Sequence, residues 1–141
     1  MNEQIIGLDI GDVRIGVAVS DASRLIASPV EVITRVGWGP DCKKICEICE
    51  RYQTRLVVSG LPLNMDGTEG FQAQKVRGLC DQLVKHGLTV YYQDERLSTV
   101  AAEDSLIMGG VHRKGRKQVV DKVAAAVILQ SYLDAQKEKK I

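Results

Sequence analysis

The stretch IIGLDIGDVRIGVAVSD, residues 5–21, decides the fold of this chain. Two runs of alternating, β-branched residues, Ile5–Ile10 and Ile15–Val19, flank the turn-forming pair Gly11-Asp12. This pattern is typical of a β-hairpin. Asp9 lies inside the first strand, where a buried charge without a partner would cost several kcal/mol. Asp9 is therefore either a sheet-end residue that caps the turn or a metal ligand, and the second interpretation requires further carboxylates at the same place.

Length and composition indicate one ordinary globular domain. The chain has 141 residues, of which 45% are hydrophobic and 26% are charged, and its net charge is +1. This length suffices for a single core, and we assign residues 1–136 to one domain and residues 137–141 to a basic C-terminal tail. The N-terminus has no signal-peptide pattern, and no stretch approaches the roughly 20 apolar residues of a membrane span. We therefore expect a cytoplasmic protein without a membrane partner.

Three of the four cysteines have the spacing C-x3-C-x2-C, by which radical-SAM enzymes hold an iron–sulfur cluster: Cys42, Cys46 and Cys49. The same cysteines also lie on the inward stripe of an amphipathic helix. Cluster ligands of that type lie on a loop, whereas residues 41–51 have helical character throughout. We therefore expect reduced cysteines that pack in the core.

The rest of the chain alternates strands with helices. A third strand is expected over 25–33, where Pro29 indicates an edge position or a bulge. Residues 35–40 have the glycines and proline of a loop. The later elements are expected in this order: a helix over 41–52, a strand over 56–60, a loop over 61–70, a helix over 68–86 with Val76, Leu79, Cys80, Leu83 and Val84 buried, a strand over 89–93, a helix from 98 or 99 to 108, a basic linker over 112–117 and a helix over 118–136. The order βββαβαβαα predicts an α/β domain with a mixed five-stranded sheet flanked by helices.

Acidic residues mark three of these elements. Asp9 lies in the first strand, Asp94-Glu95 end the last strand, and Asp121 opens the last helix, on a face that also carries Ala124-Ala125. Taken alone, Asp121 could simply complement the helix dipole. Small residues on that face would, however, let the helix backbone approach the sheet. Carboxylates that converge need cations, and hard oxygen ligands favour Mg²⁺ or Mn²⁺, as in two-metal hydrolysis of a phosphodiester.

Four motifs resemble the YqgF family, which is described both as pre-16S rRNA nucleases and as Holliday junction resolvase-like proteins: GLDIGDVRIGVAVSD (7–21), GLPLNMDGTEG (60–70), DERLST (94–99) and VDKVAAAVILQSYL (120–133). They occur in the family's order and cover nearly the whole chain. The resemblance implies a ribonuclease H-like fold, a cytoplasmic location and a metal-dependent nuclease that processes the 5′ end of 16S rRNA. Precursor rRNA, and with it ribosomal precursor particles, are the implied partners.

The resemblance also implies an acidic triad. Asp9, Glu95 and Asp121 correspond to its members, which would be both catalytic residues and ligands of Mg²⁺ or Mn²⁺. Asp94 is the alternative to Glu95, which we prefer because a glutamate at the end of that strand is similar to the resolvase pattern. Related resolvases carry an additional acid a short way along the last helix, where this chain departs from the pattern with Ala124-Ala125.

Other positions of the motifs are expected to contact substrate or, alternatively, to serve the structure. Arg14 either contacts phosphate or pairs with Asp12, and Arg96 either binds phosphate or neutralises the acids between turnovers. Asn64 and Asp66 either position substrate or form a turn. The basic run is expected either to be solvated or to clamp the phosphate backbone of a nucleic acid; it consists of Arg113, Lys114, Arg116 and Lys117.

Two further functions are left open by the sequence. The chain could resolve Holliday junctions in DNA, or it could be a non-catalytic nucleic-acid-binding regulatory factor on the same scaffold, because a fold does not determine a function. RNA is the expected substrate and structured DNA the alternative. The hairpin also resembles the phosphate-binding hairpin of the actin, Hsp70 and sugar kinase superfamily, but those proteins close two domains over ATP and are much longer.

Overall fold

A computed structural model describes residues 3–94 and 113–139, with the backbone alone for residues 113–120 and 137–139. The described part contains a five-stranded sheet, in which the strands have the order β3-β2-β1-β4-β5. The first three strands form an antiparallel meander, whereas β4 pairs in parallel with β1 and with β5. The bounds are β1 Ile6–Ile10, β2 Arg14–Ser20, β3 Ala27–Thr34, β4 Leu56–Leu61 and β5 Thr89–Asp94. The predicted mixed sheet is thus confirmed.

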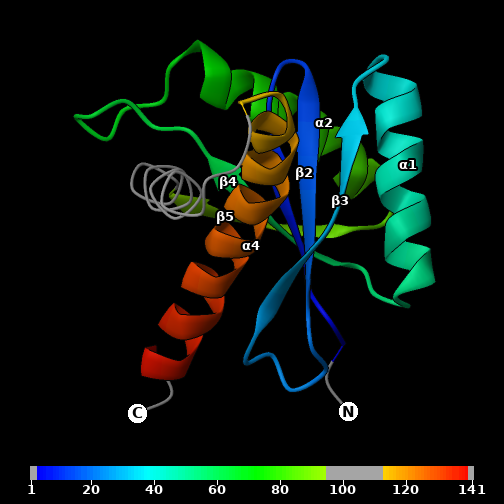
Figure 1. Ribbon diagram of the computed structural model, residues 1–141, viewed down its shortest axis with the longest axis vertical. Helices are drawn as coiled ribbons and strands as arrows, with labels where there is room; N and C mark the ends of the chain where they lie inside the picture. Colours follow the sequence, from blue (N-terminus) through cyan, green and yellow to red (C-terminus); the bar gives the residue numbers. More distant parts are fainter. Residues whose placement is uncertain (1–2, 95–112, 140–141) are drawn as a thin grey trace.

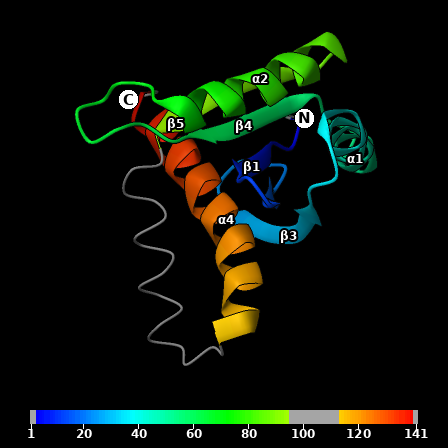
Figure 2. The same cartoon turned by 90° about the horizontal axis from the view of Figure 1, so that it is seen from above.

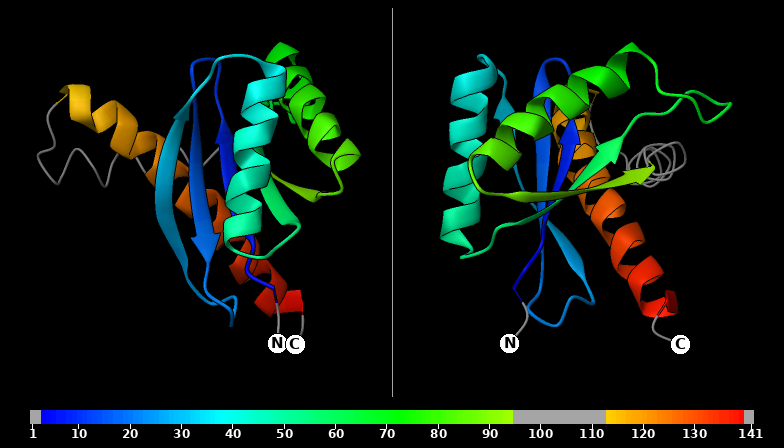
Figure 3. Two further views of the ribbon diagram at one scale, coloured as in Figure 1. Left: turned by 90° about the vertical axis from the view of Figure 1, so that its right-hand side faces the viewer. Right: turned by 180° about the vertical axis from the view of Figure 1, so that it is seen from behind.

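The described helices cover both faces of this sheet (Figure 1). One face is covered by α1, Trp38–Arg51, and α2, Phe71–Lys85. The other face is crossed by α4, Arg113–Lys139, so that the sheet lies between two helical layers (Figures 2 and 3). The helix predicted over 98–108 lies outside the described residues. None of the described helices has an apolar stretch long enough to span a membrane.

The hairpin and the edge strand form as the sequence predicts. The amide of Gly11 donates to the carbonyl of Arg14 at 2.9 Å and closes the turn between β1 and β2. β3 is an edge strand, and its pairing with β2 shifts register between Val17 and Ala18, next to Pro29. Because proline has no amide hydrogen to donate, an edge position with a bulge accommodates it.

Strand alternation divides the buried residues into two cores, one on each face of the sheet. The core under α1 and α2 is built mainly on even-numbered β1 and odd-numbered β2 residues and includes Ile6, Leu8, Ile15, Val17, Ile45, Leu79 and Leu83. The core under α4 uses the residues of opposite parity and includes Ile5, Ala18, Val58, Ala125, Ile128, Leu129 and Leu133. Asp9 is separated from Ile5 by an even number of positions along the chain, so its side chain projects to the same face of the sheet, which α4 covers.

Several helix boundaries and one buried position differ from the prediction, among them the start of α2, which lies at Phe71 rather than at 68. α1 begins at Trp38 rather than at residue 41, because Pro40 lies in the first turn, where a helix needs no amide donor from it. Val84, predicted to be buried, is 53% exposed. α4 begins at Arg113 rather than at 118, so the predicted basic linker is helical, as the high helix propensity of Arg, Lys and Gln allows. α4 also continues to Lys139, into the predicted tail.

The cysteines of α1 pack in the core, as predicted. Cys42 and Cys49 are buried on the inward side of α1, and Cys80 is buried on α2. Burial raises the pKa of the Cys49 thiol to about 12. Since the thiolate is the reactive form, this residue is a small hydrophobic side chain at neutral pH.

Candidate active site

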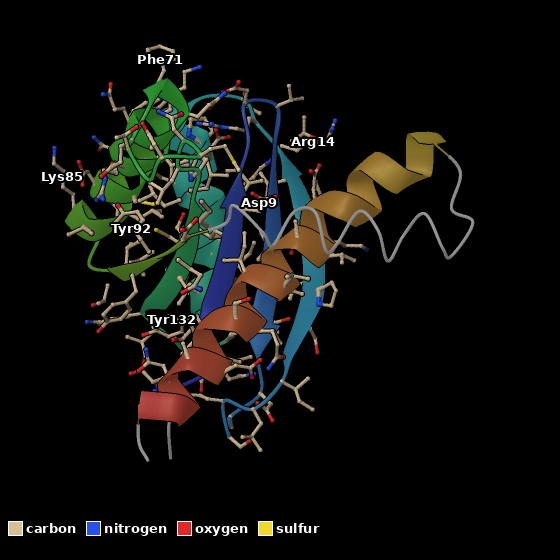
Figure 4. The ribbon with its side chains drawn as sticks, turned by 90° about the vertical axis from the view of Figure 1, so that its left-hand side faces the viewer. Asp9, Arg14, Phe71, Lys85, Tyr92 and Tyr132 are labelled. Carbon is tan, nitrogen blue, oxygen red and sulfur yellow. The ribbon has the colours of Figure 1, made fainter. Side chains whose placement is uncertain are left out.

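Asp9 lies near the end of β1, on the face covered by α4 (Figure 4). Its register partner on β2 is Gly16, and directly paired residues of an antiparallel ladder project to the same face. Gly16 has no side chain, so the space beside Asp9 is left open on that face. The Asp9 side chain is partly buried and makes interactions within the protein.

The backbone of α4 fills this space. A Cβ atom added to Gly16 would lie 1.8 Å from the carbonyl oxygen of Asp121, and one added to Gly7 would lie 2.8 Å from the Cβ of Leu129. Two glycines on neighbouring strands therefore let α4 lie directly on the sheet. The backbone of Asp121 consequently packs on Gly16, which pairs with Asp9, although Asp9 and Asp121 are far apart in the sequence. The backbone of Asp121 therefore lies next to the strand position of Asp9, and the convergence of their carboxylates on one metal site stays a prediction.

Ala124 and Ala125 complete this close approach. Both are fully buried, and a Cβ atom added to Gly7 would also lie 3.1 Å from the carbonyl oxygen of Ala125. Their predicted role as the small-residue face of the last helix is confirmed. Both alanines serve packing in this chain.

Arg14 contacts Asp121 across the same junction. The guanidinium Nε donates to Oδ2 of Asp121 at 2.6 Å, and the two side chains are 29% and 24% exposed. The alternative that Arg14 pairs with Asp12 is therefore wrong. Asp12 instead accepts hydrogen bonds from Gln72 and Lys75 of α2.

The contacts of Asp12 attach the turn of the hairpin to α2. Hydrogen bonds from Gln72 and then Lys75 lower the pKa of the Asp12 carboxyl. On the side of α1, Arg35 donates to the carbonyl oxygen of Gly11 and to the buried Asp41. A hollow of about 390 Å³ opens between these elements, lined by Asp12, Arg35, Val36, Gly37, Trp38, Asp41 and Lys75. The turn that follows Asp9 is thus held from both helices.

The alternation of β5 separates Asp94 from Asp9. Asp94 is the register partner of Leu61, which is buried under α1 and α2, and parallel partners project to the same face. Tyr91 has the opposite parity and stacks on Tyr132 of α4, with ring centroids 6.0 Å apart. Asp94 therefore lies on the face away from α4. Glu95 and Arg96 lie outside the described residues.

The loop after β4 shows the structural role that the sequence allowed for Asn64 and Asp66. Asp66 Oδ1 accepts hydrogen bonds from the amide and the hydroxyl of Thr68, and Asn64 donates its side-chain amide to the same hydroxyl. Gly67 has a φ of 87°, which favours glycine at this position of the turn. The turn-forming interpretation is confirmed, and contact of these residues with substrate stays a prediction.

The predicted basic clamp lies at the beginning of α4. Arg113, Lys114, Arg116 and Lys117 belong to its first turns, which project beyond the sheet (Figure 3, left). Their backbone is described and their side chains are not, so their contact with a phosphate backbone stays a prediction.

The carboxylates suit a divalent ion. Asp9 and Asp121 supply charged oxygen donors, which Mg²⁺ and Mn²⁺ prefer, and one flank of the site is open enough to leave Asp121 24% exposed. Within residues 3–94 and 121–136, no three Asp, Glu, His or Cys side chains are grouped as metal ligands. The third predicted ligand, Glu95, is not among these residues. Asp9 and Asp121 carry the type of donor that Mg²⁺ and Mn²⁺ prefer, and their role as ligands together with Glu95 stays a prediction.

The sequence alone did not reveal Gly7 and Gly16 as determinants of the site. Each interrupts a run of β-branched residues, and a glycine inside a strand signals a close backbone approach. That signal was available. It did not identify the approaching segment, because α4 lies at the other end of the chain.

Comparisons with known proteins find similar sequences and similar folds. The family model RuvX, described as Holliday junction resolvase, matches residues 3–135. A relative from Clostridioides difficile (strain 630) is 50% identical over 136 residues, which cover 95% of this chain and 96% of that protein. A relative from Clostridium tetani (strain Massachusetts / E88) is 47% identical over 133 residues and covers 94% and 96%. Both carry the name of a candidate pre-16S rRNA nuclease.

Solved structures show the same fold at low sequence identity. RuvC from T. thermophilus, in complex with a Holliday junction substrate, has a TM-score of 0.62 at 17% identity and covers 95% of this chain and 96% of its own. The fowlpox virus resolvase, in complex with Holliday junction DNA, has a TM-score of 0.54 at 11% identity and covers 94% and 98%. The expected ribonuclease H-like fold is confirmed.

Proposed function

This chain belongs to the RuvX family, the YqgF family of the sequence motifs, and on that premise we propose that it is a metal-dependent endonuclease that processes the 5′ end of precursor 16S rRNA. The observation that carries the proposal is the junction of α4 with the hairpin. There the backbone of Asp121 lies on Gly16, the register partner of Asp9. The substrate follows from the names of relatives that are 47% and 50% identical over nearly the whole chain.

The residues have separate roles in this proposal. Asp9, Glu95 and Asp121 hold the divalent ion, Mg²⁺ or Mn²⁺. When bound, the ion supplies an activated water and stabilises the charge that develops on the leaving oxygen. Preference for Glu95 over Asp94 is supported by the strand alternation, which puts Asp94 on the opposite face from Asp9.

Cationic and polar residues around the acids bind the nucleic acid. Arg96 contacts the scissile phosphate, and Asn64 and Asp66 position the strand from the turn after β4. The beginning of α4 contacts flanking phosphates through Arg113, Lys114, Arg116 and Lys117. Binding through phosphates weakens as salt rises and carries little base specificity. The protein would act in the cytoplasm, on ribosomal precursor particles.

The proposal is tested by cleavage of defined substrates with Mg²⁺ or Mn²⁺. Asp9→Asn and Asp121→Asn are expected to lower the cleavage rate at least about 100-fold, since each removes a charge that stabilises the transition state. Asp134→Asn, the same change further along α4 on an exposed residue, is the matched control and is expected to keep full activity. Glu95→Gln is expected to be inactive and Asp94→Asn active.

The choice of substrates separates the competing functions. A precursor 16S rRNA fragment, an unstructured RNA and a four-way DNA junction are compared under the same conditions. Faster cleavage of the DNA junction would favour the resolvase activity that the family description names. Equal cleavage by wild type and Asp9→Asn would contradict the proposed site. If the protein binds RNA but cleaves none of the substrates with either metal ion, the result would favour a non-catalytic nucleic-acid-binding factor.

A further inference from the structure

Arg14 donates a hydrogen bond to one carboxylate oxygen of Asp121, a proposed metal ligand. Arg14 Nε lies 2.6 Å from Oδ2 of Asp121, although the two residues are 107 positions apart in the sequence. Both side chains are only partly exposed, at 29% and 24%. Removal from bulk water makes such a pair less screened than one on the open surface. The carboxylate that would face a divalent ion therefore already has a cationic partner.

The scaffold fixes Arg14 at this place. The Gly11–Arg14 hydrogen bond closes the hairpin at Arg14, and strand alternation places Arg14 on the same face as Gly16. Asp9 and Arg14 lie at the same end of the neighbouring strands β1 and β2 (Figure 4), and the α4 backbone at Asp121 packs on Gly16, the register partner of Asp9. The neighbouring acid Asp12 accepts hydrogen bonds from Gln72 and Lys75 and does not compete with Asp121 for Arg14.

We propose that Arg14 exchanges partners during the reaction: it pairs with Asp121 while the metal site is empty and with a substrate phosphate once a divalent ion binds Asp121. This inference rests on the proposed nuclease function. It makes Arg14 a substrate-positioning residue whose availability depends on the metal.

The exchange follows from the charges of the three groups. A guanidinium and a divalent ion compete for the same carboxylate oxygen, so the ion weakens the pair when it binds. Arginine does not lose its proton at any physiological pH, and the released guanidinium needs another anion. A phosphate has two oxygens in the geometry that the guanidinium fork binds best. Metal and nucleic acid are therefore expected to increase each other's affinity by the same factor, as linkage requires.

The experiment measures this coupling without cleavage. Mn²⁺ binding is followed by calorimetry, with and without a 2′-O-methyl RNA that resists hydrolysis. RNA binding is followed by fluorescence anisotropy in EDTA and in Mn²⁺. In wild type we expect each ligand to raise the affinity for the other about tenfold. In Arg14→Gln, Mn²⁺ alone is expected to bind about three- to tenfold more tightly, because a competing cation is gone, and the coupling is expected to fall below about twofold.

Three further variants complete the design. Arg14→Lys keeps the charge and is expected to show intermediate coupling, which provides a reading if Arg14→Gln does not fold. In EDTA, Asp121→Asn is expected to bind RNA more tightly than wild type because Arg14 is free, and the double variant Arg14→Gln/Asp121→Asn is expected to lose this gain. Arg51→Gln removes an exposed arginine that pairs with Glu31 and is the matched control, with unchanged affinities and coupling.

The outcomes separate this inference from the proposed function. If Arg14→Gln has the Mn²⁺ affinity and the coupling of wild type, Arg14 only attaches α4 to the hairpin, and the exchange is overturned while the nuclease site stands. If Asp121→Asn binds Mn²⁺ as tightly as wild type, Asp121 is not a metal ligand, and the proposed site itself is overturned.

Discussion

Single residues hold the hairpin turn in place, and Asp41 is the clearest case. Its side chain is fully buried in the first turn of α1. Oδ1 accepts a hydrogen bond from the amide of Val36, and Oδ2 accepts one from Arg35, each at 3.0 Å. Arg35 in turn donates to Gly11, two residues after Asp9. Asp41 therefore connects the core of the protein to the strand end that carries the candidate catalytic acid.

Asp41→Asn is expected to destabilise the protein by about 1.5–3 kcal/mol at pH 7, the contribution typical of hydrogen bonds to a charged group. Burial alone would raise the pKa of Asp41, but the hydrogen bonds from Val36 and Arg35 outweigh it and hold the pKa below the usual 3.8. The stabilisation is thus complete above pH 3.8 and is lost as the pH falls through the lower pKa of the folded state.

Urea unfolding at several pH values measures this effect. The difference between wild type and Asp41→Asn is expected to be constant from pH 7 to about pH 5 and to shrink in stronger acid. Asp81→Asn, on an exposed position of α2, is the control and is expected to be neutral. A difference that grows on acidification would contradict the assigned protonation state of Asp41.

At the scale of the elements, the contact of α4 with the hairpin decides whether a site exists. Gly7 on β1 and Gly16 on β2 admit the helix backbone, and the buried alanines of α4 match them. Gln130 then attaches the helix to the edge of the meander, where it accepts from the amide of Ala27 and donates to the carbonyl of Leu25, each at 2.9 Å. The orientation of α4, and with it the place of Asp121, depends on these contacts.

Gly16→Ala is expected to displace the beginning of α4, because its Cβ would overlap the backbone of Asp121. We expect a loss of about 1–3 kcal/mol of stability, as for other overpacked cores, together with loss of Mn²⁺ binding. Gly39→Ala in the first turn of α1 is the matched control, since a Cβ there meets nothing within 4 Å. It is expected to keep Mn²⁺ binding and to leave the stability unchanged or slightly higher. Calorimetry and urea unfolding check both variants, and normal Mn²⁺ binding by Gly16→Ala would argue against the assigned junction.

At the scale of the whole molecule, both cores depend on the same strands. Residues of one parity build the core under α1 and α2, and residues of the other parity build the core under α4. The second face is covered by α4 as far as the described residues extend (Figure 3). If one core unfolds, the apolar side chains on that face of the sheet become exposed to water. The same strands carry the second core on their opposite face. The two faces are therefore expected to unfold together.

Leu129→Ala tests this cooperativity. Leu129 is fully buried on α4, and truncation of a buried leucine typically costs about 2–5 kcal/mol. Trp38, the single tryptophan, lies on the other side of the sheet against Gly78 of α2, so its fluorescence reports on the opposite core. Fluorescence and circular dichroism are expected to shift to lower urea by the same amount. Val84→Ala, at a 53% exposed position, is the control. A fluorescence transition that stays at the wild-type midpoint would show that the faces unfold separately.

Local patterns in the sequence predicted most of the fold. The alternating runs of β1 and β2, the edge position of Pro29 and the inward stripes of α1 and α2 were all readable, because strand and helix periods are local properties. The errors lie at the helix ends Trp38, Phe71, Arg113 and Lys139, where competing local signals decide the boundary, and at Val84, which is exposed.

The sequence by itself determined which residues could form the site, namely Asp9 and Asp121, and the four motifs that place the chain in its family. Only the tertiary structure decided that the backbone of Asp121 packs on Gly16, beside Asp9, and that Arg14 pairs with Asp121 rather than with Asp12. The physical reason is that residue type and periodicity act over a few residues. Contact between β1, β2 and α4 instead depends on how closely two backbones pack, and the absent side chains of Gly7 and Gly16 set that distance.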